Sequence, residues 1–208
     1  MKRSPRTTVA AGLVLLMNLI PLHSVLTRGW PVVFVVMLFW FEALVLVVFA
    51  ALKALIAPLP GPRPAVLIGK VVISGATLAF HGGLVLGYGF FLALLFGGTM
   101  TDQGIVASPD IALDVLAAMW GDNGVLVAAL VIVARHLYAF ATRFLARGAW
   151  RETRATDFFD EPMRRTVLLH VGIVLSGIVL LLFLPPLAAA ALLIVLKTAA
   201  DLHPRFLG

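Results

Sequence analysis

Ionisable and amide side chains lie inside long apolar stretches of this 208-residue chain. A charged side chain near the middle of a membrane helix costs about 2.5–3.5 kcal/mol on insertion scales, so such residues usually serve a purpose. Counted at about 1.5 Å of rise per residue, these side chains lie at similar depths in the membrane, although they belong to different apolar stretches. The sequence therefore predicts one shared polar site. Its candidate members are Asn18, Glu42, His81, Arg135, His136, His170, Lys197, Asp201 and His203.

The histidines and carboxylates in this set suit a metal. Zinc, iron, manganese and copper take imidazole and carboxylate ligands in proteins. The predicted ligands are Glu42, His81, His136 and His170. Asp201 and His203 are predicted as outer partners that orient the ligands. The expected cofactor is a divalent transition metal, and the alternative is a haem held by two histidines. The spacing lacks the compact HExxH form, so hydrogen bonding between helices stays open for each histidine.

Asn18, Arg135 and Lys197 of this set, together with Tyr88, predict a binding site for a small or lipid-like ligand. Arg135 keeps its charge and could hold an anionic headgroup or substrate. Lys197 and Asp201 are four residues apart and can form an ion pair along one helix.

Composition assigns the whole chain to the membrane. Hydrophobic residues make up 62% of it and charged residues 12%, whereas soluble domains carry roughly 25% charge. Disorder, a secreted disulfide scaffold and a water-soluble enzyme are excluded. The absence of cysteine excludes thiolate metal sites and disulfides. The net charge of +6 comes from basic residues beside apolar stretches, which indicates topology anchors rather than nucleic-acid binding. The lipid bilayer is the expected partner. A second copy of the chain is a further candidate partner, which the sequence does not test.

The predicted fold is all-α, a bundle of six transmembrane helices in a single domain. The spans are expected at about residues 9–26, 31–57, 70–96, 125–145, 166–184 and 187–202. Basic residues gather before span one, after spans two and four, and after span six. The positive-inside rule then places both termini in the cytoplasm of a multi-pass protein of the inner (plasma) membrane.

Two loops are expected to carry structure. The outer loop, residues 97–124, contains a short amphipathic segment at 109–120 with helical periodicity. Residues 146–165 form a charged cytoplasmic loop. Within span three, Gly83 and Gly87 form a small-xxx-small pair that predicts close approach of a neighbouring helix.

The order and spacing of these polar residues resemble a known family. The segments that carry the resemblance are Asn18-Leu-Ile-Pro21, Trp40-Phe-Glu42, Phe80-His81-Gly82, His136-Leu-Tyr-Ala-Phe140, Arg165-Thr-Val-Leu-Leu-His170 and Leu196-Lys197-Thr-Ala-Ala-Asp201-Leu-His203. They are similar to a family of small polytopic bacterial and archaeal membrane proteins classed only as a domain of unknown function. The family usually has Asn after the span-two Glu and an aromatic after the span-three His, where this chain has Ala43 and Gly82. The resemblance implies no activity.

Three functions remain open from the sequence. A metal or cofactor site in the cytoplasmic half would suit a membrane metalloenzyme or oxidoreductase. A small transporter or proton-coupled carrier would use the buried Glu, Asp and His as relays. A structural or assembly protein would use the same residues only to organise the bundle. Whether the protein is an enzyme is left undecided by the residues alone.

Overall fold

Long helices form most of the computed structural model, which describes residues 5–97, 99–101, 104–106, 109–159, 167 and 186–202. The predicted span at 166–184 falls almost entirely outside the described residues, and so do His170 and His203. The first two helices are α1 (Pro5–Arg28) and α2 (Val32–Ile56). Gly29 has a positive φ of 66° in the turn between them, a conformation that glycine adopts without strain.

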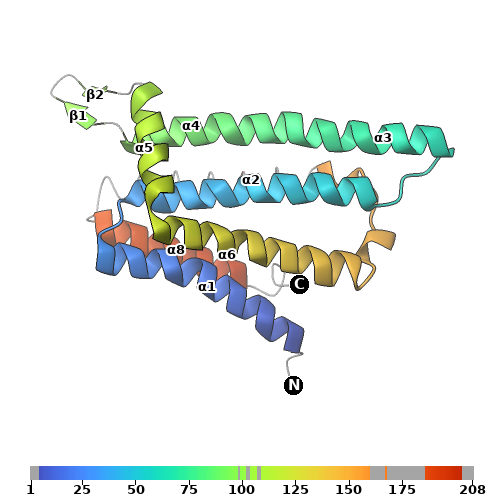
Figure 1. The fold of residues 1–208 in the computed structure, drawn as a ribbon, viewed down its shortest axis with the longest axis horizontal. Coiled ribbons are helices and arrows are strands. Elements are labelled where there is room, and N and C mark those ends of the chain that lie inside the picture. Colours follow the sequence, from blue (N-terminus) through green and yellow to red (C-terminus); the bar gives the residue numbers. More distant parts are fainter. Residues whose placement is uncertain are drawn as a thin grey trace.

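Helix α2 lies at the centre of the bundle because it is apolar around its whole circumference. It packs against α3, α4, α6 and α8 (Figure 1). Val35, Met37 and Leu38 are completely buried on it. A helix that is hydrophobic on all sides is expected in the core of a large helical protein or in a membrane.

The next helical stretch runs without a break from Arg63 to Gly97. It consists of α3 (Arg63–Ala76), a π-helical turn η1 (Thr77–Gly82) and α4 (Gly83–Gly97). The predicted span at 70–96 lies within it. The π-helical turn was not predicted from the sequence; such a turn adds a residue to the local repeat and frequently marks functional sites.

A short hairpin and a short helix follow α4. Strand β1 (Thr99–Thr101) pairs antiparallel with β2 (Gly104–Val106), a pairing that the sequence analysis did not predict. Helix α5 (Pro109–Gly121) covers the segment in which the sequence predicts an amphipathic helix. Its Ala112 and Met119 are buried, whereas Asp114 is exposed.

The remaining elements begin with α6 (Asn123–Ala139), whose first turn is capped by Asp122. The Asp122 carboxylate accepts hydrogen bonds from the backbone N–H groups of Gly124 and Val125. The helix continues as a π-helical turn η2 (Phe140–Leu145), and a short 3₁₀ turn η3 (Ala149–Arg151) follows. Helix α8 (Pro186–Leu202) packs against α1 and α2.

Four helical stretches in the described part of the chain are long and apolar enough to cross a membrane. They are Ala11–Arg28, Val32–Ile56, Arg63–Leu94 and Asn123–Leu145. The prediction of a helical chain with several helices suited to span a membrane is therefore confirmed in this coarser form. Each of the four contains most of one of the first four predicted spans.

Contacts at opposite ends of the bundle fix the antiparallel order of these helices. At one end, the Trp30 indole N–H donates to the Asp122 carboxylate at 3.3 Å. At the other, the Ala155 N–H donates to the Pro58 carbonyl at 3.2 Å, and the Lys53 ammonium lies over the Phe158 ring. The C-terminal part of α2 and the segment after α6 therefore contact each other at the same end of the bundle.

Candidate functional site

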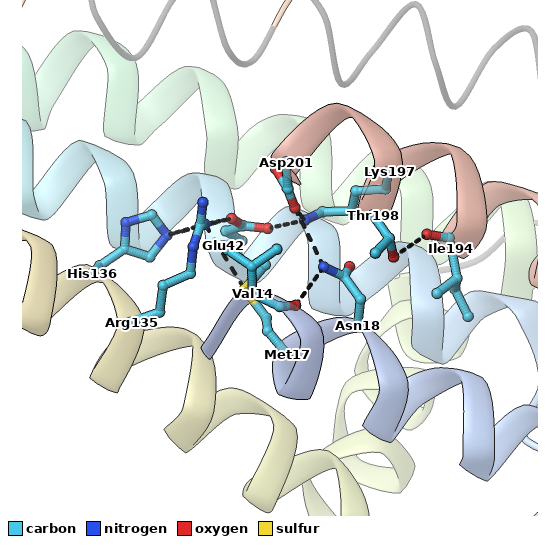
Figure 2. A network of polar contacts seen from close by, with 10 residues as sticks. All are labelled: Val14, Met17, Asn18, Glu42, Arg135, His136, Ile194, Lys197, Thr198 and Asp201. Atoms are coloured by element: carbon cyan, nitrogen blue, oxygen red, sulfur yellow. Dashed lines mark hydrogen bonds and ion pairs between the residues drawn. The ribbon is translucent and has the colours of Figure 1, made fainter. Parts of the chain in front are cut away.

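The buried carboxylate of Glu42 is the centre of a polar network between α2, α6 and α8 (Figure 2). Its Oε1 accepts a hydrogen bond from Arg135 Nη1 at 2.8 Å, and its Oε2 lies 2.8 Å from Lys197 Nζ. His136 Nε2 is 3.4 Å from Oε1, within hydrogen-bond range when that nitrogen carries a proton. The Glu42 side chain is 8% exposed. The carboxylate of Glu42 therefore connects its own helix, α2, to both α6 and α8.

Lys197 extends the network along α8 to a second carboxylate. Its Nζ lies 2.6 Å from Asp201 Oδ2, the ion pair expected from the four-residue spacing. Asp201 Oδ2 also accepts a hydrogen bond of 3.4 Å from Asn18 Nδ2, which ties α1 to α8. The two carboxylates, Glu42 and Asp201, are balanced by Arg135 and Lys197, so the network carries no net charge when His136 is neutral.

Asn18 leaves one of its polar atoms unused. Its Nδ2 donates to the Val14 carbonyl at 2.9 Å as well as to Asp201, and both partners are acceptors. This arrangement fixes the orientation of the amide, because the flipped amide would face two acceptors with its oxygen. Asn18 Oδ1 is then buried without a donor among the described residues.

Apolar and aromatic side chains surround the network. Lys197 Nζ lies 5.1 Å from the centroid of the Phe39 ring, and the Phe49 ring stacks on His136 at 6.1 Å. Arg135 Nη1 is also 3.9 Å from Met17 Sδ. Few water molecules can compete in such surroundings, so the attraction between the opposite charges is stronger than at a surface.

His81 occupies a different environment. It lies on the π-helical turn η1, 2% exposed, with its ring 4.7 Å from that of Phe159 and 5.1 Å from that of Phe80. Its Nε2 has no hydrogen-bond partner in the described part of the chain. Tyr88, another candidate from the sequence, is half-buried on α4 and packs against the main hydrophobic core.

The described residues do not support a metal centre. No group of three or more His, Asp or Glu side chains in that part of the chain could hold a metal ion. Glu42 and His136 do meet, but two cations already bind the carboxylate, and they would repel a divalent ion. His81 packs among phenylalanines instead. His170 and His203 lie outside the described residues, so their predicted roles stay predictions.

Arg143 and Arg147 belong to the basic residues after span four, which were interpreted from the sequence as topology anchors only. In the structure, Arg143 lies on η2, the continuation of the helix that carries Arg135, and Arg147 follows just after it, so positive charge continues from the network toward the end of the helix. The signal in the sequence was the recurrence of arginine at positions eight and four residues apart on one helical stretch.

The chain matches a family described as "Family of unknown function (DUF6498)" over residues 1–207. The protein belongs to this family. No curated protein and no solved structure matches the chain. The resemblance to an uncharacterised family is confirmed, and the family assigns no activity to the site.

Proposed function

We propose that this protein is a small carrier in the plasma membrane that couples proton binding to the passage of an anionic solute. The observation behind the proposal is the sharing of Lys197 between two carboxylates, Glu42 on α2 and Asp201 on α8. A proton taken up by either carboxylate frees Lys197 to pair with the other. One proton therefore changes both the charge of the network and the contact between two helices.

The proposed topology has six spans with both termini in the cytoplasm. Support comes from the four long apolar helices, from the alternation of basic loops, and from the pairing of helix ends described above. In Figure 1, α1 runs toward the end of the bundle that holds α5, and α8 runs in the opposite direction, away from that end. The fifth and sixth spans are proposed at 166–184 and 187–202, the latter close to α8.

Charge balance supports carriage of an anion. With both carboxylates ionised, Arg135 and Lys197 are compensated. A proton on Glu42 leaves one positive charge in excess, which favours binding of an anion from water. Release of the proton restores the balance and expels the anion. Intramembrane acids, bases and histidines are used in this way by proton relays of pumps and transporters.

Transport by reconstituted protein tests the proposal. Protein in proteoliposomes would be supplied with radiolabelled lactate or phosphate, with the outside more acidic than the inside. We expect uptake several-fold above protein-free liposomes, and loss of its dependence on the pH gradient in Glu42→Gln. Glu152→Gln is the control, because Glu152 is an exposed acid in the segment after α6.

A purely structural network gives a different result. In that case folded wild-type protein would move neither solute, and Glu42→Gln would change stability alone. This outcome would overturn the carrier and favour an assembly role.

A further inference from the structure

The guanidinium of Arg135 has hydrogen-bond donors that the network does not use. Arginine carries five N–H donors in a planar fork. The bond to Glu42 and the longer contacts to His136, at 3.5 Å, and Met17, at 3.9 Å, all come from Nη1. Within the described residues, the printed contacts of Arg135 do not involve Nε or Nη2. Neither nitrogen is among the fully buried atoms that lack a partner, so both keep some exposure. The side chain is nevertheless only 10% exposed.

Three N–H groups on a side chain with so little exposure are poorly hydrated, so a ligand that accepts hydrogen bonds from them would stabilise the guanidinium. The Nε–Nη2 edge of a guanidinium presents two parallel N–H groups, a geometry that matches the two oxygens of a carboxylate or phosphate. A lysine at this position would supply the charge without this fork. The unused edge therefore specifies a planar or tetrahedral oxyanion better than a spherical anion.

The charge around Arg135 also favours an anion. Arg143, half-buried, lies on η2, the continuation of the helix that carries Arg135, and the exposed Arg147 follows just after η2. Neither Arg143 nor Arg147 has an acidic partner within the described residues. Together with Lys197 these arginines place four cations against the two carboxylates of the network. A row of arginines leading to a buried one can draw an anion inward from the end of the helix.

We infer that the Nε–Nη2 edge of Arg135 binds a carboxylate or phosphate oxyanion that reaches it from the side of Arg143 and Arg147. The inference rests on the proposed carrier function and names the substrate class of that carrier. The same oxyanion chemistry occurs in free solutes and in anionic lipid headgroups, and the experiment separates these two sources.

Binding is measured without transport. Protein in phosphatidylcholine nanodiscs would be unfolded thermally in increasing lactate or phosphate, with sodium chloride at matched ionic strength as the reference. A second set of nanodiscs would contain phosphatidylglycerol and no added solute. We expect a higher unfolding midpoint with lactate, phosphate or phosphatidylglycerol than with chloride. Protection only by phosphatidylglycerol identifies the occupant as a headgroup, whereas protection by the solutes identifies a free anion.

Two variants assign the binding to Arg135. Arg135→Lys keeps a cation beside Glu42 but removes the fork, and we expect about tenfold weaker binding. Arg143→Gln leaves the Glu42 contact intact and should weaken binding by a few fold. Arg63→Gln is the control, because this exposed arginine lies at the start of α3 and should bind as the wild type does.

Equal protection by chloride, or unchanged affinity in both Arg135→Lys and Arg143→Gln, would overturn the inference. Its failure is distinguishable from failure of the carrier. Binding that depends on Arg135 without any uptake would remove the carrier and leave the site. Uptake that depends on Glu42, together with binding that does not change in the Arg135 variant, would support the carrier and remove the proposed site.

Discussion

Glu42 Oε1 and Arg135 Nη1 lie 2.8 Å apart in the interior of the bundle, although 93 residues separate them in the chain. Their side chains are 8% and 10% exposed. A complete buried ion pair adds little net stability, because both charges lose their hydration. Removal of one partner is strongly destabilising, since the other charge stays buried without compensation. Loss of the Glu42 carboxylate should therefore destabilise the fold more than the small net contribution of the complete ion pair suggests.

The first prediction concerns Glu42→Gln, which keeps the size of the side chain and removes its charge. We expect the free energy of unfolding to fall by about 3–5 kcal/mol, because Arg135 and Lys197 lose their shared partner. Chemical denaturation in detergent micelles measures the change. Glu152→Gln, an exposed control, should stay within about 0.5 kcal/mol of the wild type. A loss below about 1 kcal/mol in Glu42→Gln would contradict the prediction.

The sharing of Lys197 predicts energetic coupling between Glu42 and Asp201. Asp201→Asn keeps an acceptor for Asn18 but weakens the second ion pair of Lys197. In a double-mutant cycle with Glu42→Gln, we expect a coupling of about 0.5–3 kcal/mol between the two positions. Strictly additive effects on the unfolding free energy would show that Lys197 does not link the carboxylates.

Contact between α2 and α4 predicts opposite effects at two nearby glycines. Trp40 Nε1 donates to the Val85 carbonyl at 2.6 Å, and its ring fills the space that a Gly89 Cβ would need. Gly89→Ala should therefore cost about 1–3 kcal/mol through overpacking. Gly87→Ala, whose Cβ would meet no described residue within 4 Å, should be neutral or stabilise by about 0.5–1 kcal/mol. Similar unfolding midpoints for the two variants would be inconsistent with this packing.

The environment of His81 predicts that the imidazole can be replaced. Its Nε2 is buried without a partner in the described residues, and phenylalanines contact its ring. We expect His81→Leu to unfold no more readily than the wild type, because an unsatisfied polar group is replaced by an apolar one. Elemental analysis of the purified proteins is the second readout. A metal bound by the wild type and lost in His81→Leu would support the metal hypothesis instead.

Fusion reporters test the proposed topology. We expect a reporter at Gly104, in strand β2, on the side of the membrane opposite to a reporter at Arg154. The basic residues near Arg154 should keep that loop in the cytoplasm. A reporter signal from the same side at both positions would overturn the six-span order.

Much of the fold could be predicted because membrane helices are specified by local composition. The apolar runs gave the approximate position of α1, α2 and the two long stretches that follow. The π-helical turns η1 and η2 could not be predicted, since apolar runs with and without an inserted residue look alike. Prediction also selected Gly83 and Gly87 for close helix contact. The structure instead places Trp40 against Gly89, and among the described residues it shows no neighbour within 4 Å of a Cβ at either predicted position.

The residues that form the candidate site were predicted better than the chemistry of the site. Depth along the spans correctly grouped Asn18, Glu42, Arg135, His136, Lys197 and Asp201. Depth does not give the direction in which a residue faces, so His81 was grouped with them although it packs against Phe159. Residue type alone suggested metal ligands. Only the structure shows that two cations occupy the carboxylate of Glu42.

The order of the charges along the chain has a consequence for synthesis. Chains are made from the N-terminus, so Glu42 enters the bilayer before Arg135 or Lys197 exists. Helix α2 can tolerate this early charge because it is the most apolar of the four long helices. A chain truncated before α8 would keep Glu42 paired with Arg135 but without Lys197. Helix α8, which is made after α2 and α6, therefore decides whether the carboxylate of Glu42 is fully compensated, which gives the cell a chemical difference between copies with and without this helix.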